Sequence, residues 1–404
     1  MDKILKLYYS DENKRRQSYW KNIKNSVRGE IQWHGIPKNS TKNDNLMPIT
    51  ADCLDTLWCN LFDLRLDRFF NEPEYYLKNI LKIKIEKFIK IPDDTPIDTK
   101  IPIWFGTPFE ASILGQNVFY ISDEYPWLDR NVIYNKQSNF SKILNFENNP
   151  IIRKARWFYK VIKRKVSSDF HVIFPKWFRG PQGVALYIRG YENFLTDFYL
   201  NKDFVHKLLQ FIIKVQKKYI IWRANDIGED IDKVDLYNDD IPLISPKIYE
   251  TFILPYEQEL ANFTKGIYYW HSCGDITNHI PKIMELKKID LLDIGVSVED
   301  KEKAIKIVNP NIPLEIRVLA SKYIQNTSEI EIKDYMKNII ISCKKFNIKK
   351  YVLRTSGMSV LNGPLEDLKR LRNWIKITRD VQKELINYPV LKKGVRSQHL
   401  TYKC

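Results

Sequence analysis

The chain has 404 residues, of which 44% are hydrophobic and 13% aromatic, and its formal net charge is +16. These proportions predict a globular protein with a large core, and no apolar run is long enough for a transmembrane helix or a signal peptide. The five cysteines are scattered without a CxxC pair, which argues against a secreted disulfide framework and predicts a cytoplasmic protein.

The positive charge comes mostly from lysines that are spread along the chain among isoleucines and asparagines. The only basic clusters are KVIKRK at 160–165 and KKGVR at 392–396, and neither contains interleaved aromatics or a nucleic-acid-binding motif. We therefore expect neither a nucleic-acid nor a membrane partner.

The first half of the chain is irregular. Helical patterns cover 11–27 and 73–91. In the segment 101–122, apolar and polar residues alternate on either side of a glycine-containing break, which predicts a strand or a hairpin. Residues 170–183 read as a strand and loop, and 202–225 as a long helix. These patterns predict that residues 1–95 form a helical N-terminal extension.

The second half alternates short apolar runs with amphipathic segments. Ser245 is a candidate N-cap, because Pro246 follows at the first helical position. The predicted strands, each followed by a helical pattern, begin within 233–240, 266–275, 289–297, 312–320 and 349–359.

Repeated strand–helix units predict parallel strands, in an open sheet or in a closed barrel. No GxGxxG motif follows a strand, which removes the main argument for a dinucleotide-binding open sheet. The expected fold is an α/β class (β/α)8 barrel of the TIM type over 96–385, with a basic C-terminal tail over 386–404.

In such a barrel the active-site residues lie on loops at the carboxyl ends of the strands. Four loops should therefore share one mouth: 174–180, 236–240, 270–275 and 354–359. The third of these, WHSCGD, contains His271 and Cys273 in a chain with only six histidines and five cysteines.

With these loops in view, the chain resembles the uroporphyrinogen decarboxylase superfamily, and most of all its corrinoid-dependent methyltransferase branch. The resemblance runs through 189–209, 238–260, 271–295 and the C-terminal strand and helix. Its most specific part is the helix SPKIYETFILPY followed by HSCGD.

The resemblance implies that His271 and Cys273 are zinc ligands, because an H-x-C motif at this position supplies two ligands in the methyltransferase branch. A cysteine after the last strand supplies another there, but RTSGMS in this chain has Ser356, Gly357 and Met358. Asp239 and Asp240 are the candidates for the replacement ligand, since zinc accepts carboxylate oxygen, and Asp239 is our choice. The alternative is an ordinary strand end whose polar groups are satisfied locally.

Further residues are candidates for binding the substrate. Arg179 and Arg354 each end a strand and could clamp an anionic group, although an ordinary ion pair is the alternative for each. Trp177, Trp270 and Met358 could form a pocket wall, although large apolar side chains more often belong to the core.

The resemblance thus implies zinc-assisted methyl transfer between a small methylated substrate or thiol and a corrinoid carried by a separate protein. Asp239, Asp240, His271 and Cys273 would be its catalytic residues. Two alternatives stay open: a metal-free decarboxylase of the uroporphyrinogen decarboxylase type, and a non-catalytic barrel that has lost a metal ligand.

Overall fold

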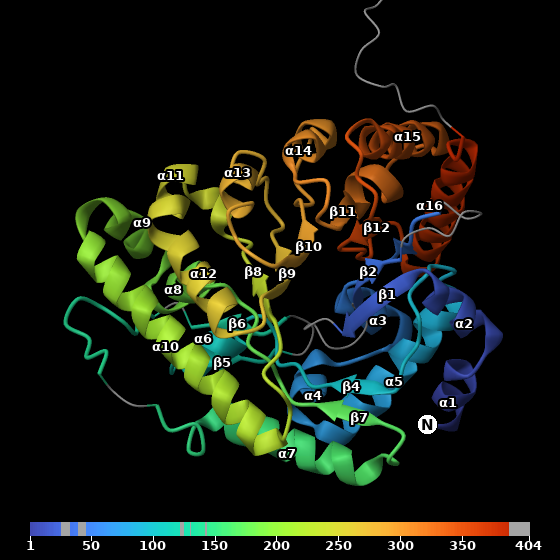
Figure 1. Cartoon of the computed structure of the whole chain (residues 1–404). Helices are drawn as coiled ribbons and strands as arrows, with labels where there is room; N and C mark the ends of the chain where they lie inside the picture. The colour runs from blue at the N-terminus through green and yellow to red at the C-terminus, as the bar shows by residue number, and fades with distance from the viewer. Residues whose placement is uncertain (26–32, 39–45, 122–124, 130, 142–143, 388–404) are drawn as a thin grey trace, which may run out of the picture.

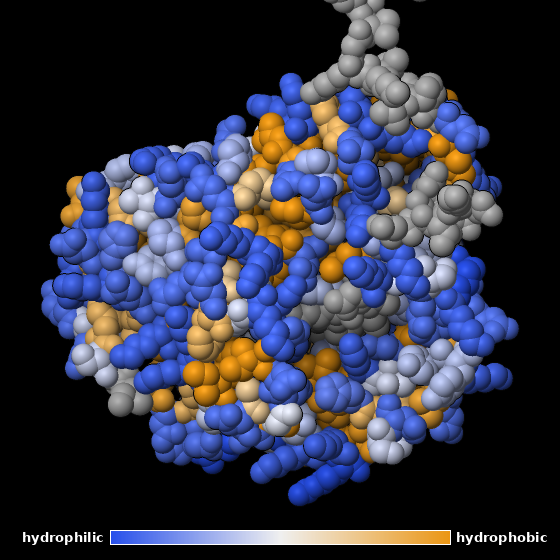
Figure 2. Space-filling model, in the orientation of Figure 1, coloured by the Kyte–Doolittle hydropathy of each residue, from blue (hydrophilic) through white to orange (hydrophobic). Residues whose placement is uncertain are grey.

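The structure is a computed structural model that describes the chain except residues 26–32, 39–45, 122–124, 130, 142–143 and 388–404. The basic tail predicted over 386–404 therefore lies almost wholly outside the described residues. None of the described helices is long and apolar enough to cross a bilayer. On the face drawn in Figure 2, the surface is mostly hydrophilic, with small separate hydrophobic areas.

A parallel sheet of six strands forms the larger part of the barrel. In spatial order it contains β3 (Ile49–Thr50), β12 (Tyr351–Ser356), β11 (Leu314–Leu319), β10 (Ile289–Asp293), β9 (Ile267–His271) and β8 (Val234–Tyr237). Every neighbouring pair in this sheet is parallel. The five strands predicted from the second half of the sequence are thus parallel and adjacent in chain order.

Two further strands complete the ring. β4 (Lys100–Pro102) pairs in parallel with β7 (His171–Ile173). The segment after β7 joins β8 through a parallel bridge between Arg179 and Tyr237. The segment before β4 joins β3, because the Asp94 N–H donates to the Ile49 carbonyl at 2.8 Å. The strands therefore follow one another around a closed TIM barrel, and the predicted fold class is confirmed.

Helices surround the strands, as Figure 1 shows for α14, α15 and α16 beside β10, β11 and β12. The helices are α1 (Asp2–Tyr8), α2 (Asp11–Ser18), α3 (Asp55–Phe62), α4 (Leu66–Asn71), α5 (Pro73–Lys90), α6 (Phe109–Ile113), α7 (Pro150–Lys165), α8 (Pro181–Arg189), α9 (Tyr191–Leu200), α10 (Lys202–Ile227), α11 (Pro246–Ile248), α12 (Leu254–Phe263), α13 (Ile280–Ile283), α14 (Lys301–Ile307), α15 (Glu329–Lys345) and α16 (Pro364–Glu384).

Local sequence explains several of these elements. All five side chains of β9 are buried, as expected for a parallel strand that is covered on both faces. Ser245 caps the helical segment that follows, since its side chain accepts from the Ile248 N–H, with Pro246 at the first helical position. A π-helical turn over Tyr249–Ile253 links α11 to α12, so the helix predicted to begin at Ser245 is confirmed and continues to Phe263.

The first 95 residues differ from the predicted helical extension. Helix α2 ends at Ser18, and β1 (Trp20–Asn25) pairs antiparallel with β2 (Trp33–Pro37), which lies next to β12 (Figure 1). The buried Trp20 indole donates to the Asp94 carbonyl at 2.9 Å, a tertiary contact that overrides the helical pattern. The division at residue 95 also separates β3 from its partner β12, although β3 belongs to the barrel.

Two later segments also differ from their patterns. The expected strand or hairpin at 101–122 contains the helix α6 between β4 and the short strand β5 (Val118–Phe119), which pairs antiparallel with β6 (Trp127–Leu128). The helical pattern that follows the strand at 266–275 contains only the short helix α13, which has Pro281 in its first turn, where proline is tolerated.

Candidate metal centre

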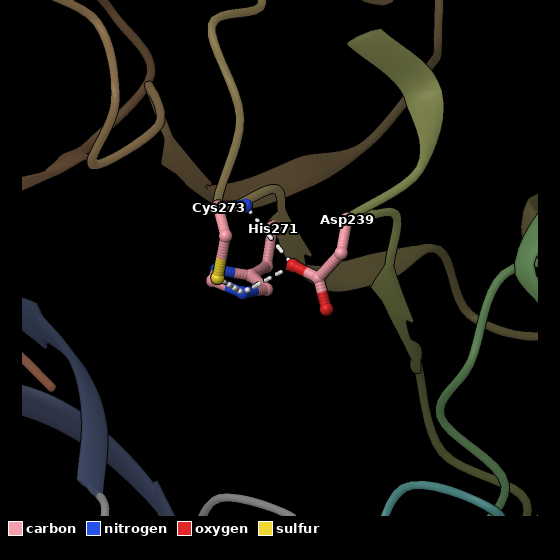
Figure 3. Close-up of side chains that lie close together, drawn as sticks. All are labelled: Asp239, His271 and Cys273. Carbon is pink, nitrogen blue, oxygen red and sulfur yellow. Dashed lines mark hydrogen bonds and ion pairs between the residues drawn. The ribbon is translucent and has the colours of Figure 1, made fainter. Parts of the chain in front are cut away.

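Asp239, His271 and Cys273 lie together at the carboxyl ends of β8 and β9 (Figure 3). One ligand atom from each lies within 4.8 Å of the others. His271 Nε2 is 3.1 Å from Asp239 Oδ1 and 3.4 Å from Cys273 Sγ. The three residues that the sequence suggested as a metal set are therefore brought together, because both strands run in the same direction and end at one mouth.

Backbone contacts fix the loop that carries Cys273. Its N–H donates to Asp239 Oδ1 at 3.0 Å, and its carbonyl accepts from the Ser297 N–H at 3.1 Å. A Cβ added to Gly274 would lie 2.2 Å from the Pro242 ring, so only glycine fits where the loop packs on the segment after Asp239. The two ligand-bearing loops are thus packed directly against each other.

A second carboxylate orients the histidine. Asp293, the last residue of β10, places Oδ2 at 2.6 Å from His271 Nδ1, and the Tyr269 hydroxyl donates to the same oxygen at 3.3 Å. A carboxylate on one imidazole nitrogen holds the proton there and directs the other nitrogen to a metal. His271 therefore presents Nε2 to Asp239 and Cys273.

Arg317 on β11 is the largest charged group beside the three residues. Its Nη1 lies 3.7 Å from Cys273 Sγ and 3.4 Å from Asp293 Oδ2. Its Nη2 donates to Ser356 at 2.6 Å and to Asp52 at 3.2 Å. The guanidinium thus ties the ends of β3, β10, β11 and β12 together beneath the mouth.

The donor set fits a zinc ion. Zinc is bound by thiolate sulfur, imidazole nitrogen and carboxylate oxygen, and all three kinds of donor converge here. Burial alone would lower the pKa of His271, but Cys273 and Asp239 raise it well above its ordinary value. The Asp239 carboxylate, which favours a cationic imidazole, equally favours a metal cation at this place.

The other charged candidate residues of the site are engaged elsewhere. Asp240 pairs with Arg179 and accepts from the Tyr191 hydroxyl at 3.0 Å, so it turns away from His271. Arg354 is buried, 3.5 Å from Glu315 on the neighbouring strand. Both arginines expected to be anion clamps are therefore already paired with carboxylates, because a buried guanidinium requires a counter-charge.

The expected pocket wall also lies in the core. Trp270 is fully buried behind β9, where its indole donates to Glu257 of α12 at 3.1 Å. Trp177 is buried and donates to the Arg179 carbonyl at 3.1 Å. Met358 is fully buried and forms a parallel bridge with Cys53. All three side chains belong to the hydrophobic core, and their role as a pocket wall stays a prediction.

Sequence reasoning missed Asp293 and Arg317. Asp293 ends the strand IDLLD, so the rule that polar residues at strand ends face the mouth could have found it. Arg317 lies among apolar residues in LEIRVL. Because charged residues are rarely buried without a partner, a charged residue inside a buried strand indicates a candidate site residue. Their contacts with His271 are not visible in the sequence, because they join three separate strands.

Comparisons with known proteins agree with this fold. The sequence model of the family described as Uroporphyrinogen decarboxylase (URO-D) matches residues 94–376. No curated protein sequence gives a significant match. Among solved structures, a methyltransferase from Methanosarcina mazei superposes with a TM-score of 0.55 at 14% sequence identity, over 81% of this chain and 93% of that one. At this identity the likeness shows the fold alone.

Proposed function

Because the chain belongs to the uroporphyrinogen decarboxylase family, we propose that it is a zinc-dependent methyltransferase with Asp239, His271 and Cys273 as metal ligands. It transfers a methyl group between a small methylated substrate or thiol and a corrinoid carried by a separate protein. The observation that carries the proposal is the convergence of three different zinc donors at the barrel mouth. The likeness of the fold to a methyltransferase supports the reaction class.

The residues of the chain have distinct tasks in this proposal. Three protein ligands leave one coordination position for a substrate atom. A bound zinc ion would lower the pKa of a substrate thiol, or polarise a methylated oxygen, nitrogen or sulfur atom. Asp293 keeps Nε2 of His271 free to bind, since it occupies Nδ1. Arg317 places a fixed positive charge beside the Cys273 sulfur.

The charge pairing at the mouth favours this function over decarboxylation. A substrate with several carboxylates needs cationic side chains that are available to bind it. Arg179 is paired with Asp240, Arg354 with Glu315, and Arg317 with Asp52 and Asp293. Since each of these guanidinium groups already has an acidic partner, the decarboxylase alternative is less well supported.

Metal analysis of untagged purified protein tests the proposal, because an affinity tag could itself bring metal. We expect about one zinc per chain, and transfer of the methyl group of free methylcobalamin to a small thiol, or loss of a methyl group from a methylated substrate to a reduced corrinoid. The absorption of the corrinoid follows either direction. A chain that takes up no zinc, and whose Cys273→Ala variant keeps full activity in these assays, would contradict the proposal and leave the non-catalytic alternative.

A further inference from the structure

One buried carboxylate lies behind the strand end that carries His271 and Cys273. Glu257 on α12 is fully buried. Its Oε2 accepts from the Trp270 indole at 3.1 Å and from the Tyr249 hydroxyl at 2.8 Å. Trp270 immediately precedes His271 in β9. Since successive side chains of a strand point to opposite faces, Trp270 faces the helix layer while His271 faces the mouth.

The strand end that carries Asp239 is joined to the strand end that carries His271. Asn238 immediately precedes Asp239 and is buried. The Asn238 N–H donates to the His271 carbonyl at 2.7 Å, which joins the two strand ends directly. A Cβ at Gly180 would lie 1.8 Å from the Asn238 side-chain oxygen, so glycine is required there for Asn238 to keep this place.

We infer that Glu257 is a positioning residue that fixes the strand end carrying His271 and Cys273 by holding Trp270, the residue before His271. The inference rests on the proposed metal site but not on methyl transfer. An apolar residue at this position would avoid the cost of burying a carboxylate, which is severe unless the group is hydrogen-bonded. The retained carboxylate satisfies two buried donors, and one of these belongs to the strand end with His271.

The affinity of the chain for zinc, measured by competition with a chromophoric chelator, tests the inference. In Glu257→Ala we expect zinc to bind about 10- to 100-fold more weakly, as for the loss of other groups that orient metal ligands. Glu257→Gln should restore most of the affinity, because its amide oxygen accepts from the same two donors. Absorption of the cobalt(II)-substituted protein supplies a second readout, since its bands report the geometry of the ligands.

Tyr256→Phe is the matched control on the same helix. Its hydroxyl bonds to His206 on α10 at 2.8 Å and contacts neither strand end, so zinc should bind as in the wild type. Trp270→Phe, which removes only the indole donor, supplies a second test if Glu257→Ala does not fold.

The outcomes separate the two ideas. Wild-type affinity in Glu257→Ala, or in Trp270→Phe when the first variant does not fold, would overturn the positioning role and leave the metal site intact. A wild-type chain without zinc affinity would overturn both.

Discussion

Asp293 Oδ2 lies 2.6 Å from Nδ1 of His271, so the carboxyl end of one strand orients the imidazole at the end of its neighbour. His271 is 3% exposed and Asp293 is fully buried, which shields this contact from water. An interaction between buried charged or polar groups is screened little by solvent, and its geometry is fixed by the strands on both sides. The proposed metal site therefore depends on three adjacent strands rather than on one loop.

Removing this orienting carboxylate should weaken metal binding without removing a ligand. We expect Asp293→Ala to lower zinc affinity by about 10- to 100-fold, because His271 loses the group that holds its tautomer. Equilibrium zinc titration measures the effect. Asp290, which pairs with Lys233 at 2.5 Å at the other end of the same strand, is the control, and Asp290→Ala should leave zinc affinity unchanged. Equal affinities in the two variants would contradict the orienting role.

Replacing a ligand should have a larger effect than replacing its orienting group. Cys273→Ala and His271→Ala should lose stoichiometric zinc while keeping the wild-type circular dichroism spectrum, because mouth residues contribute little to core packing. Cys343 on α15 is fully buried, and Cys343→Ala should keep the metal and lose about 1 kcal/mol of stability. Zinc retained in both mouth variants would show that the ion binds elsewhere.

The two adjacent aspartates should behave differently. Asp239→Asn should lose zinc, because the amide lacks the charge that a zinc carboxylate ligand supplies. Asp240→Asn should keep zinc but lose stability, because the buried Arg179 loses its charged partner, and hydrogen bonds to charged groups contribute about 1.5–3 kcal/mol. Metal analysis and urea unfolding of both variants check this, and zinc lost from Asp240→Asn instead would reverse the assignment.

Arg317 should be important for stability. Arg317→Met leaves Asp52 and Asp293 without this guanidinium, and breaking a buried ion pair costs about 3–5 kcal/mol. Arg156 pairs with Glu147 and Asp226 at the surface, so Arg156→Met should cost no more than about 1 kcal/mol. Urea unfolding compares the two, and similar losses would contradict a buried network at the mouth.

The burial of Glu257 predicts that the stability of the folded chain depends on pH. Burial raises its pKa from 4.5 to about 7 in the folded chain. Between these values the unfolded chain releases the proton while the folded chain keeps it, so the contribution of Glu257 to stability falls as pH rises and is lost above about pH 7. The full difference is roughly 3 kcal/mol.

Glu257→Gln cannot ionise and should therefore gain stability relative to the wild type as pH rises from 5 to 8. The free energy of unfolding in urea at pH 5, 6.5 and 8 measures this gain. A constant difference between the two proteins over this range would show that Glu257 is ionised throughout. Tyr256→Phe, which leaves Glu257 in place, should follow the wild-type pH profile.

The sequence by itself determined that the second half of the chain forms parallel strands whose ends share one mouth. The alternation of apolar runs with amphipathic segments depends on neighbours in the chain, and parallel strands place their carboxyl ends at one mouth wherever the helices lie. Asp239, His271 and Cys273 stand at the ends of two such strands, so local pattern places them at one mouth, whereas their role as zinc ligands is what the resemblance to a family implies. The start of the helical segment at Ser245 was also predictable from local sequence, because Ser245 is a typical N-cap and Pro246 follows it at the first helical position.

Only the tertiary structure decided which charged groups pair and where the barrel closes. β3 has two residues, too few for a periodic pattern, and it becomes a barrel strand through pairing with β12. Arg317 reaches His271 and Asp52, and Glu257 reaches Trp270, across separate strands and helices. These contacts depend on strand register and ring closure, which set distances between residues far apart in the chain and leave no trace in local sequence.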